Sequence, residues 1–223
     1  MPALFITATG TDVGKTFVAC ALIRALLAQG KTVEAFKPIL SGFNGLEGSD
    51  AHRLLDALGR PASDLDRMSP LRFTAPLAPP SAARAEGREI DPAVLTALCR
   101  QRIDEAGDAF LLIEGAGGVM SPLAEGTTNL DLIADLNVPT LLVAGSYLGA
   151  VSHTLTALAV LEGRGLPVAA LVISETGVVA PPTSEMTHAL RLFAPALPMI
   201  VAHRDQQWSA DALAALLDAR GVA

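Results

Sequence analysis

Short apolar runs alternate along the chain with longer stretches of helix-forming sequence. Six of these runs predict β-strands, at 3–7, 32–37, 109–114, 139–145, 168–174 and 198–202. Some are almost continuously apolar, such as Phe110-Leu111-Leu112-Ile113, as expected for strands that helices cover on both faces. The pattern therefore predicts an α/β fold, a parallel β-sheet flanked by helices on both faces.

Local signals predict where the helices begin and end. Gly30 closes the helix that starts after residue 16, and Ser49 caps a helix over 50–58. Asp91 and Pro92 begin a further helix, which Gly107 closes. The segment 60–80 is rich in Pro, Ser and Asp, and we interpret it as a surface excursion of the same domain, so that 1–223 forms a single domain.

Composition narrows the classes of partner. The net charge is −7, the chain is 51% hydrophobic, and no basic run occurs, so nucleic acid and anionic membranes are disfavoured and small molecules are expected. Cys20 and Cys99 lie at apolar helix positions without metal or redox spacing, which predicts buried free thiols and a cytoplasmic protein. We expect neither a secretory leader nor a membrane-spanning segment.

The first apolar run leads into a loop that is typical of phosphate binding. The loop reads Thr7-Ala8-Thr9-Gly10-Thr11-Asp12-Val13-Gly14-Lys15-Thr16 and continues into a helix. Backbone N–H groups of such a loop surround phosphates, the lysine binds the terminal ones, and the Thr16 hydroxyl can bind Mg²⁺. Thr9 stands where the strict pattern has glycine, and an ordinary glycine turn at a helix start is the alternative.

Two further strand ends bring charge to the same edge of the sheet, because parallel strands end together. Lys37 follows the second run and precedes a proline, and it is one of only three lysines among 16 basic residues. Because the chain uses arginine at almost all other basic positions, a lysine here indicates that a compact ammonium has a functional role. A solvated surface lysine is the alternative.

A carboxylate ends the third run. Glu114 follows four apolar residues and would be costly to bury without a cation, and Mg²⁺ needs only one or two carboxylates besides phosphates and water. Asp50 is the candidate second acid, and a first-turn helix acid is an equal alternative at this stage. The glycines at 115, 117 and 118 permit close approach to phosphates, although a tight turn also explains them. The four histidines show no metal spacing.

Taken together, these residues resemble the dethiobiotin synthetase family of ATP-dependent cyclo-ligases. The resemblance rests on an ordered set of motifs: Thr9-x-Thr11-x-Val13-Gly14-Lys15-Thr16, Lys37-Pro38-x-x-Ser41-Gly42, Ser49-Asp50, Glu114-Gly115-Ala116-Gly117-Gly118, Gly145, Leu148-Gly149 and His153. It implies a P-loop NTPase-like domain that uses ATP, Mg²⁺ and CO₂ to close the ureido ring of 7,8-diaminononanoate.

The resemblance also implies residue roles. Lys37 and Lys15 would be catalytic, and Thr16, Asp50 and Glu114 would hold Mg²⁺. The ATP-binding set would be Asp12, Val13, Gly14, Lys15, Thr16, Phe17, Asp50, Glu114, Gly115, Ala116, Gly117, Ser174 and Glu175. The diamine would bind Thr11 and Ser41 and, in a homodimer with the site at the subunit interface, the backbone amides of Gly149, Ala150 and Val151.

The chain departs from the family pattern in places. Ser174-Glu175 stands where the family often has an asparagine that contacts adenine, and a serine hydroxyl cannot make that paired contact. The segment Met199-Ile200-Val201-Ala202-His203 also differs, which leaves the base pocket unassigned.

Two alternatives share the fold. A dimeric ATPase switch of the partitioning type carries a signature lysine early in the loop, where this chain has Gly10. A ligase of another substrate is the second alternative.

Overall fold

The computed structural model describes residues 2–176, 182–204 and 208–223. Its centre is a six-stranded sheet in the order β10-β9-β8-β1-β5-β2, with every pair of neighbours parallel. The strands are β1 (Ala3–Ala8), β2 (Val33–Phe36), β5 (Phe110–Glu114), β8 (Thr140–Ser146), β9 (Val168–Glu175) and β10 (Met199–Ala202). All six predicted strands are confirmed.

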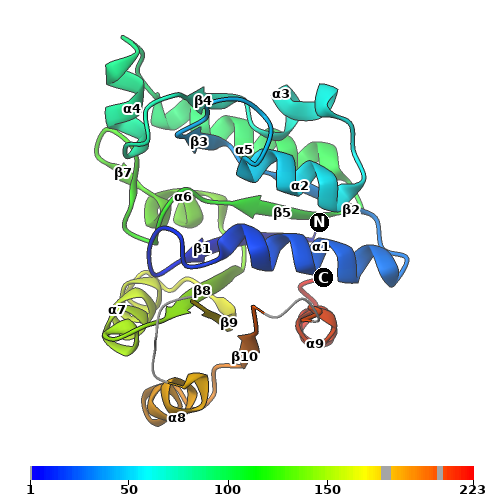
Figure 1. The fold of residues 1–223 in the computed structure, drawn as a ribbon, viewed down its shortest axis with the longest axis vertical. Coiled ribbons are helices and arrows are strands. Elements are labelled where there is room, and N and C mark those ends of the chain that lie inside the picture. Colours follow the sequence, from blue (N-terminus) through cyan, green and yellow to red (C-terminus); the bar gives the residue numbers. More distant parts are fainter. Residues whose placement is uncertain (1, 177–181, 205–207) are drawn as a thin grey trace.

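Helices cover both faces of this sheet (Figure 1). One face carries α1 (Lys15–Ala28), with α2 (Asp50–Leu58) on one side of it and α9 (Asp211–Ala219) on the other. The other face carries α5 (Pro92–Ala106), α6 (Asn129–Leu136), α7 (Ala150–Gly163) and α8 (Thr183–Phe193). The predicted α/β class and parallel sheet are therefore confirmed.

The alternation of side chains along β1 explains the two layers. Leu4 and Ile6 pack into the core beneath α1, whereas Phe5 packs into the core on the opposite face, and all three are fully buried. Successive side chains of a strand point to opposite faces, so a strand between two helical layers is buried on both faces and mostly apolar.

The predicted helix boundaries agree with the structure. The Ser49 side chain accepts a hydrogen bond from the His52 N–H at the start of α2, and Asp91 accepts from the Ala93 N–H at the start of α5. Gly107 ends α5, and the backbone of Gly30 at φ 80° follows the end of α1.

Smaller elements lie outside the main sheet. After β2 come β3 (Ile39–Ser41), a 3₁₀ turn (Ala62–Asp64), α3 (Leu65–Met68), β4 (Leu71–Phe73) and α4 (Pro79–Ala85); β6 (Pro122–Ala124) and β7 (Thr127–Thr128) follow β5. β3 pairs with β4 in parallel, and β6 pairs with β7 as an antiparallel ribbon. The predicted surface excursion over 60–80 thus has short regular elements of its own.

Candidate active site

The loop after β1 has the geometry of a phosphate-binding loop. Gly14 precedes α1 with φ 108°, a left-handed conformation that favours glycine, and no side chain caps the first turn of the helix. The N–H groups of that turn are therefore available to an anion, where the helix dipole also favours negative charge. A Cβ atom on Gly14 would lie 2.5 Å from the Ser174 hydroxyl, so no other residue fits.

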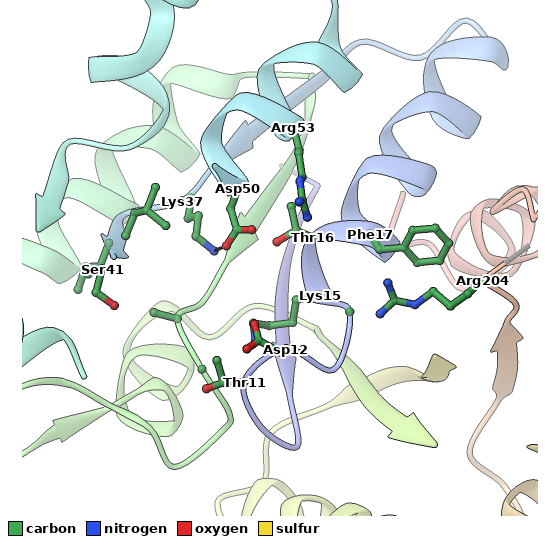
Figure 2. Close-up of a pocket in the computed structure, with 15 residues that line it drawn as sticks. Thr11, Asp12, Lys15, Thr16, Phe17, Lys37, Ser41, Asp50, Arg53 and Arg204 are labelled. Carbon is green, nitrogen blue, oxygen red and sulfur yellow. Dashed lines mark ion pairs between the residues drawn. The ribbon is translucent and has the colours of Figure 1, made fainter. Parts of the chain in front are cut away.

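A cavity of about 270 Å³ opens above this loop at the carboxyl ends of the strands (Figure 2). Eleven of its lining residues belong to the predicted site: Thr11, Asp12, Gly14, Lys15, Thr16, Phe17, Lys37, Ser41, Asp50, Ala116 and Gly117. Ile39, Leu40, Arg53 and Arg204 complete the lining and were not predicted. The structure thus gathers residues from five separate segments of the chain around one cavity.

Lys37 and Glu114 form a buried ion pair beside the cavity. The Lys37 Nζ lies 2.5 Å from Glu114 Oε1 and 2.9 Å from Asp50 Oδ2, and its side chain is 3% exposed. Burial disfavours the ammonium, but the charges of Glu114 and Asp50 outweigh this effect and raise the pKa of Lys37. Lys37 is therefore a permanently charged group.

Asp50 stays ionised for the complementary reason. Burial favours its neutral form, but the neighbouring Lys37 ammonium dominates and lowers the pKa of Asp50. The same side chain stands in the first turn of α2, where the helix dipole favours an anion. The two roles that the sequence left open for Asp50 are thus compatible in the structure.

The Glu114 carboxylate has one satisfied and one free oxygen. Its Oε1 accepts hydrogen bonds from the Thr16 hydroxyl at 2.8 Å and from Lys37. Its Oε2 is buried without a hydrogen-bond partner in the described part of the chain. A buried, unpartnered carboxylate oxygen beside a hydroxyl and a second carboxylate fits the oxygen ligands that Mg²⁺ prefers.

No group of three or more His, Cys, Asp and Glu side chains suited to a metal occurs among the described residues. A cation at Thr16, Asp50 and Glu114 would therefore take its remaining ligands from phosphates and water, as Mg²⁺ commonly does.

Lys15 folds back over its own loop. Its Nζ donates to the Gly10 carbonyl oxygen at 3.2 Å, and its side chain lines the cavity. Burial, with a smaller contribution from the charge of Lys37, lowers the pKa of Lys15 to about 8. A bound polyphosphate would offset both effects, because its negative charge favours the ammonium form of Lys15.

The loop after β5 packs directly on the phosphate loop. The Val119 N–H donates to the Ala8 carbonyl oxygen at 2.8 Å, and a Cβ atom on Gly118 would lie 3.0 Å from the Gly10 nitrogen. Asn129 at the start of α6 fixes the conformation of this loop, because its Nδ2 donates to the carbonyl oxygens of Ala116 at 2.7 Å and Gly118 at 2.8 Å. Gly118 therefore allows two backbone segments to pack closely, a reason for this glycine that the sequence analysis did not name.

Other predicted residues lie outside the cavity lining. Gly115 packs against Asn129 and the Phe5 ring, and Ser174 is fully buried beneath Gly14 with its hydroxyl unpartnered among the described residues. Val13 is 5% exposed and packs in the core on the α1 face. Glu175 accepts hydrogen bonds from His203 Nδ1 at 2.8 Å and from the Arg204 N–H, and this hydrogen bonding lowers its pKa.

The predicted anion-binding turn lies at the start of α7, after β8. Gly149 has φ 94° and no neighbour within 4 Å where a Cβ would stand. The Ala150 N–H donates to the Tyr147 carbonyl oxygen at 3.0 Å, so this bond occupies one of the three predicted amide donors, Gly149, Ala150 and Val151. Leu148 beside it is 90% exposed.

A second hollow of about 660 Å³ continues from the cavity along α1, sharing Thr16, Phe17, Arg53 and Arg204 with it. The Phe17 and Trp208 rings lie 5.5 Å apart at its border. Trp208 carried no signal in the sequence, because it lies in a segment without a motif.

Comparison with known proteins decides the family. A family model described as an AAA domain matches residues 2–209. The ATP-dependent dethiobiotin synthetase BioD of Caulobacter sp. (strain K31) is 51% identical over 96% of this chain and 93% of that protein. This chain belongs to the dethiobiotin synthetase family. A second synthetase of that name, from Phenylobacterium zucineum (strain HLK1), is 51% identical over 92% of this chain and 90% of the relative.

Solved structures of other proteins share the fold of this dethiobiotin synthetase family member. The cell division protein MinD of Aquifex aeolicus superimposes with a TM-score of 0.54 at 12% identity, over 100% of this chain and 96% of MinD. A ParA family ATPase from Chlorobium tepidum TLS gives a TM-score of 0.54 at 15% identity, over 100% and 94%. At these identities the likeness shows the P-loop fold alone.

The prediction of buried free thiols is confirmed. Cys20 and Cys99 are free and buried, and burial raises the pKa of each thiol to about 12. No helix among the described residues is long and apolar enough to span a membrane.

Proposed function

We propose that this chain catalyses the ATP-dependent closure of the ureido ring of dethiobiotin from 7,8-diaminononanoate and CO₂, with ADP and phosphate as the other products. The observation that carries the proposal is the cavity in which the phosphate loop, Lys37, Asp50 and the oxygen of Ser41 meet. The curated relatives named dethiobiotin synthetase, with 51% identity over almost the whole chain, supply the substrate class.

The reaction needs charge neutralisation at two points. One amine of the substrate takes up CO₂ as a carbamate, a carbamate oxygen attacks the terminal phosphorus of ATP, and ADP leaves. The second amine then attacks the carbonyl carbon of the mixed anhydride, phosphate leaves, and a proton is released. Both steps develop negative charge on oxygen, which fixed cations stabilise most in a site shielded from water.

In this proposal Lys37 supplies the cation at the reacting oxygens. Its ammonium is held by two carboxylates at the cavity wall, so it is fixed before the substrate binds and need not be reorganised during the reaction. Lys15, which also lines the cavity, binds the terminal phosphates. Thr11 and Ser41, which both line the cavity, hold the carbamate end of the diamine.

Thr16, Asp50 and Glu114 would hold Mg²⁺ in this proposal, because they bring together a hydroxyl, an ionised carboxylate and a buried carboxylate oxygen without a partner. A bound Mg²⁺ would neutralise charge on the phosphates during transfer. The nucleoside would lie toward the hollow bordered by Phe17 and Trp208.

We further propose a homodimer with the substrate site at its interface. Leu148, just before α7, and the 55% exposed Met120 present apolar surface. Met120 lines, with Thr11 and His153, a hollow of about 500 Å³ beside the phosphate loop. A second copy that covered this surface would bring its Gly149, Ala150 and Val151 toward the carboxylate of the substrate.

Growth of a bacterial strain that lacks its own dethiobiotin synthetase tests the function. Expression of this chain is expected to restore growth on biotin-free medium, and growth should also return when dethiobiotin is supplied instead. Failure of the expressed, folded chain where dethiobiotin succeeds would contradict the proposal.

A further inference from the structure

We propose that Arg204 is a nucleotide-binding residue of this chain, whose guanidinium binds the phosphate chain of the nucleotide beside Gly14. The inference deepens the proposed function and rests on it only in requiring that the cavity bind a nucleotide. Nothing in the sequence motifs pointed to this residue, since it follows the segment in which the chain departs from the family pattern.

The position of Arg204 follows from the sheet. It comes two residues after β10, and the parallel strands bring that end to the same edge as the phosphate loop after β1. Its side chain reaches the cavity across the end of β9, and Figure 2 shows its guanidinium directed toward the loop from the side opposite Asp50.

Three contacts fix the orientation of the guanidinium. Its Nε donates to the Glu175 carbonyl oxygen at 2.9 Å, and the Arg204 N–H donates to the Glu175 carboxylate at 3.1 Å. Its Cζ lies 4.7 Å from the centre of the Phe17 ring, a cation–π contact. Because these contacts use the Nε edge and one flat face, the terminal N–H groups are left to face the loop.

Those terminal N–H groups lie at the start of α1. A Cβ atom on Gly14 would stand 2.6 Å from Arg204 Nη2, so the guanidinium touches the residue that caps the helix. A phosphate bound by the first-turn N–H groups of α1 would meet this edge. An arginine held flat with its terminal N–H groups exposed matches the geometry of phosphate oxygens, which it can bind in a bidentate manner.

The arrangement also gives Glu175 a role. The sequence predicted that this residue binds ATP, but its carboxylate and carbonyl are engaged with His203 and Arg204. Glu175 is then a positioning residue that acts on the nucleotide through Arg204.

Another arginine of the chain shows what a solvated arginine looks like. Arg164, which follows the end of α7, pairs with Asp131, and its side chain is 49% exposed. It lines neither the cavity over the phosphate loop nor the hollow along α1 and provides a matched control.

The test is calorimetric binding of ATP, and separately of inorganic pyrophosphate, to the full chain without diamine. R204Q is expected to weaken the binding of both ligands by about 10- to 100-fold, the usual value of a charged hydrogen bond, while R164Q binds both as the wild type does. R204K keeps the charge but loses the fork, and it should lie between R204Q and the wild type.

Two results would overturn the inference. Unchanged affinity of R204Q for ATP would remove Arg204 from the site, and weakened ATP binding with unchanged pyrophosphate binding would assign it to the nucleoside. Thermal unfolding of each variant checks that the fold is retained. Because no diamine is used, these results are independent of whether ring closure is the reaction.

Discussion

Lys37 and Glu114 stand side by side as the first residue after β2 and the last residue of β5. The register of the two parallel strands pairs Phe36 with Ile113, and the next step along each strand brings the ammonium and the carboxylate to 2.5 Å. Both side chains are at most 3% exposed. Sheet geometry alone therefore places a fixed positive charge beside the phosphate loop.

Lys37 and Lys15 are expected to have different roles, one in turnover and the other in ATP binding. Lys37→Ala should lower kcat by about 10²- to 10³-fold with little change in ATP affinity, because its charge acts mainly in the transition state. Lys15→Ala should weaken ATP binding by about 10- to 100-fold, because a charged contact to the phosphates is lost in the ground state. Steady-state kinetics and calorimetry on both variants measure the two effects, and equal loss of ATP binding would contradict this division of roles.

Lys37 also has a structural role that a control can separate. Without its ammonium, the Glu114 charge is left buried, which should reduce the free energy of unfolding by about 3–5 kcal/mol. The double variant Lys37→Met with Glu114→Gln removes both charges and is expected to recover most of that stability but no turnover. If the double variant were as unstable as Lys37→Ala, the uncompensated charge would not be the cause.

Gly115 has no room for a side chain. A Cβ atom there would stand 2.3 Å from Asn129 Oδ1 and 2.9 Å from Phe5 Cε1, so Gly115→Ala should destabilise the fold by about 1–3 kcal/mol and disturb the loop that Asn129 holds. Gly163 at the end of α7 has open space around it, and Gly163→Ala should stabilise by up to about 1 kcal/mol. Urea denaturation compares the two, and equal effects would refute the packing argument.

The buried thiol of Cys99 predicts a pH dependence of stability. Burial raises its pKa from 9.0 to about 12, so between these values the unfolded chain loses a proton that the native chain keeps. Stability from this group is full below pH 9 and declines as the pH rises toward 12. The stability difference between wild type and Cys99→Ala should therefore shrink by roughly 1 kcal/mol from pH 7 to pH 10. A difference that stays constant would show that the thiol titrates alike in both states.

Leu148 tests the proposed dimer. Leu148→Asp replaces an apolar side chain that is 90% exposed just before α7 with a charged one, and it should convert a dimer to monomers and reduce turnover. Val94→Asp, on a side chain that is 52% exposed on α5, is the control and should leave the dimer intact. Light scattering after size exclusion measures both; a monomeric wild type, or a dimeric Leu148→Asp, would contradict the interface.

Periodicity revealed the main sheet because its strands are apolar on both faces. All six strands appear where the apolar runs predict them. The strands of the two small sheets were not predicted. Each is only two or three residues long and includes partly exposed positions, so no apolar run marks it.

Some residues of the candidate active site could likewise be predicted from the sequence, and others could not. Residues at the ends of apolar strands, such as Lys37 and Glu114, were visible because a charge interrupts or follows the run. Arg53 and Arg204 were not, because one lies on a polar helix and the other after the last strand, and only the folded arrangement brings them to the cavity.

The most direct test of the account supplies ATP, Mg²⁺ and ¹³C-bicarbonate to the purified chain, with and without 7,8-diaminononanoate. We predict phosphate release that depends on the diamine, together with a cyclic urea product that carries the ¹³C label, and loss of both in Lys37→Ala. Phosphate release that is indifferent to the diamine, with no labelled urea, would contradict the proposed function and leave a nucleotide hydrolase with the fold of a dethiobiotin synthetase.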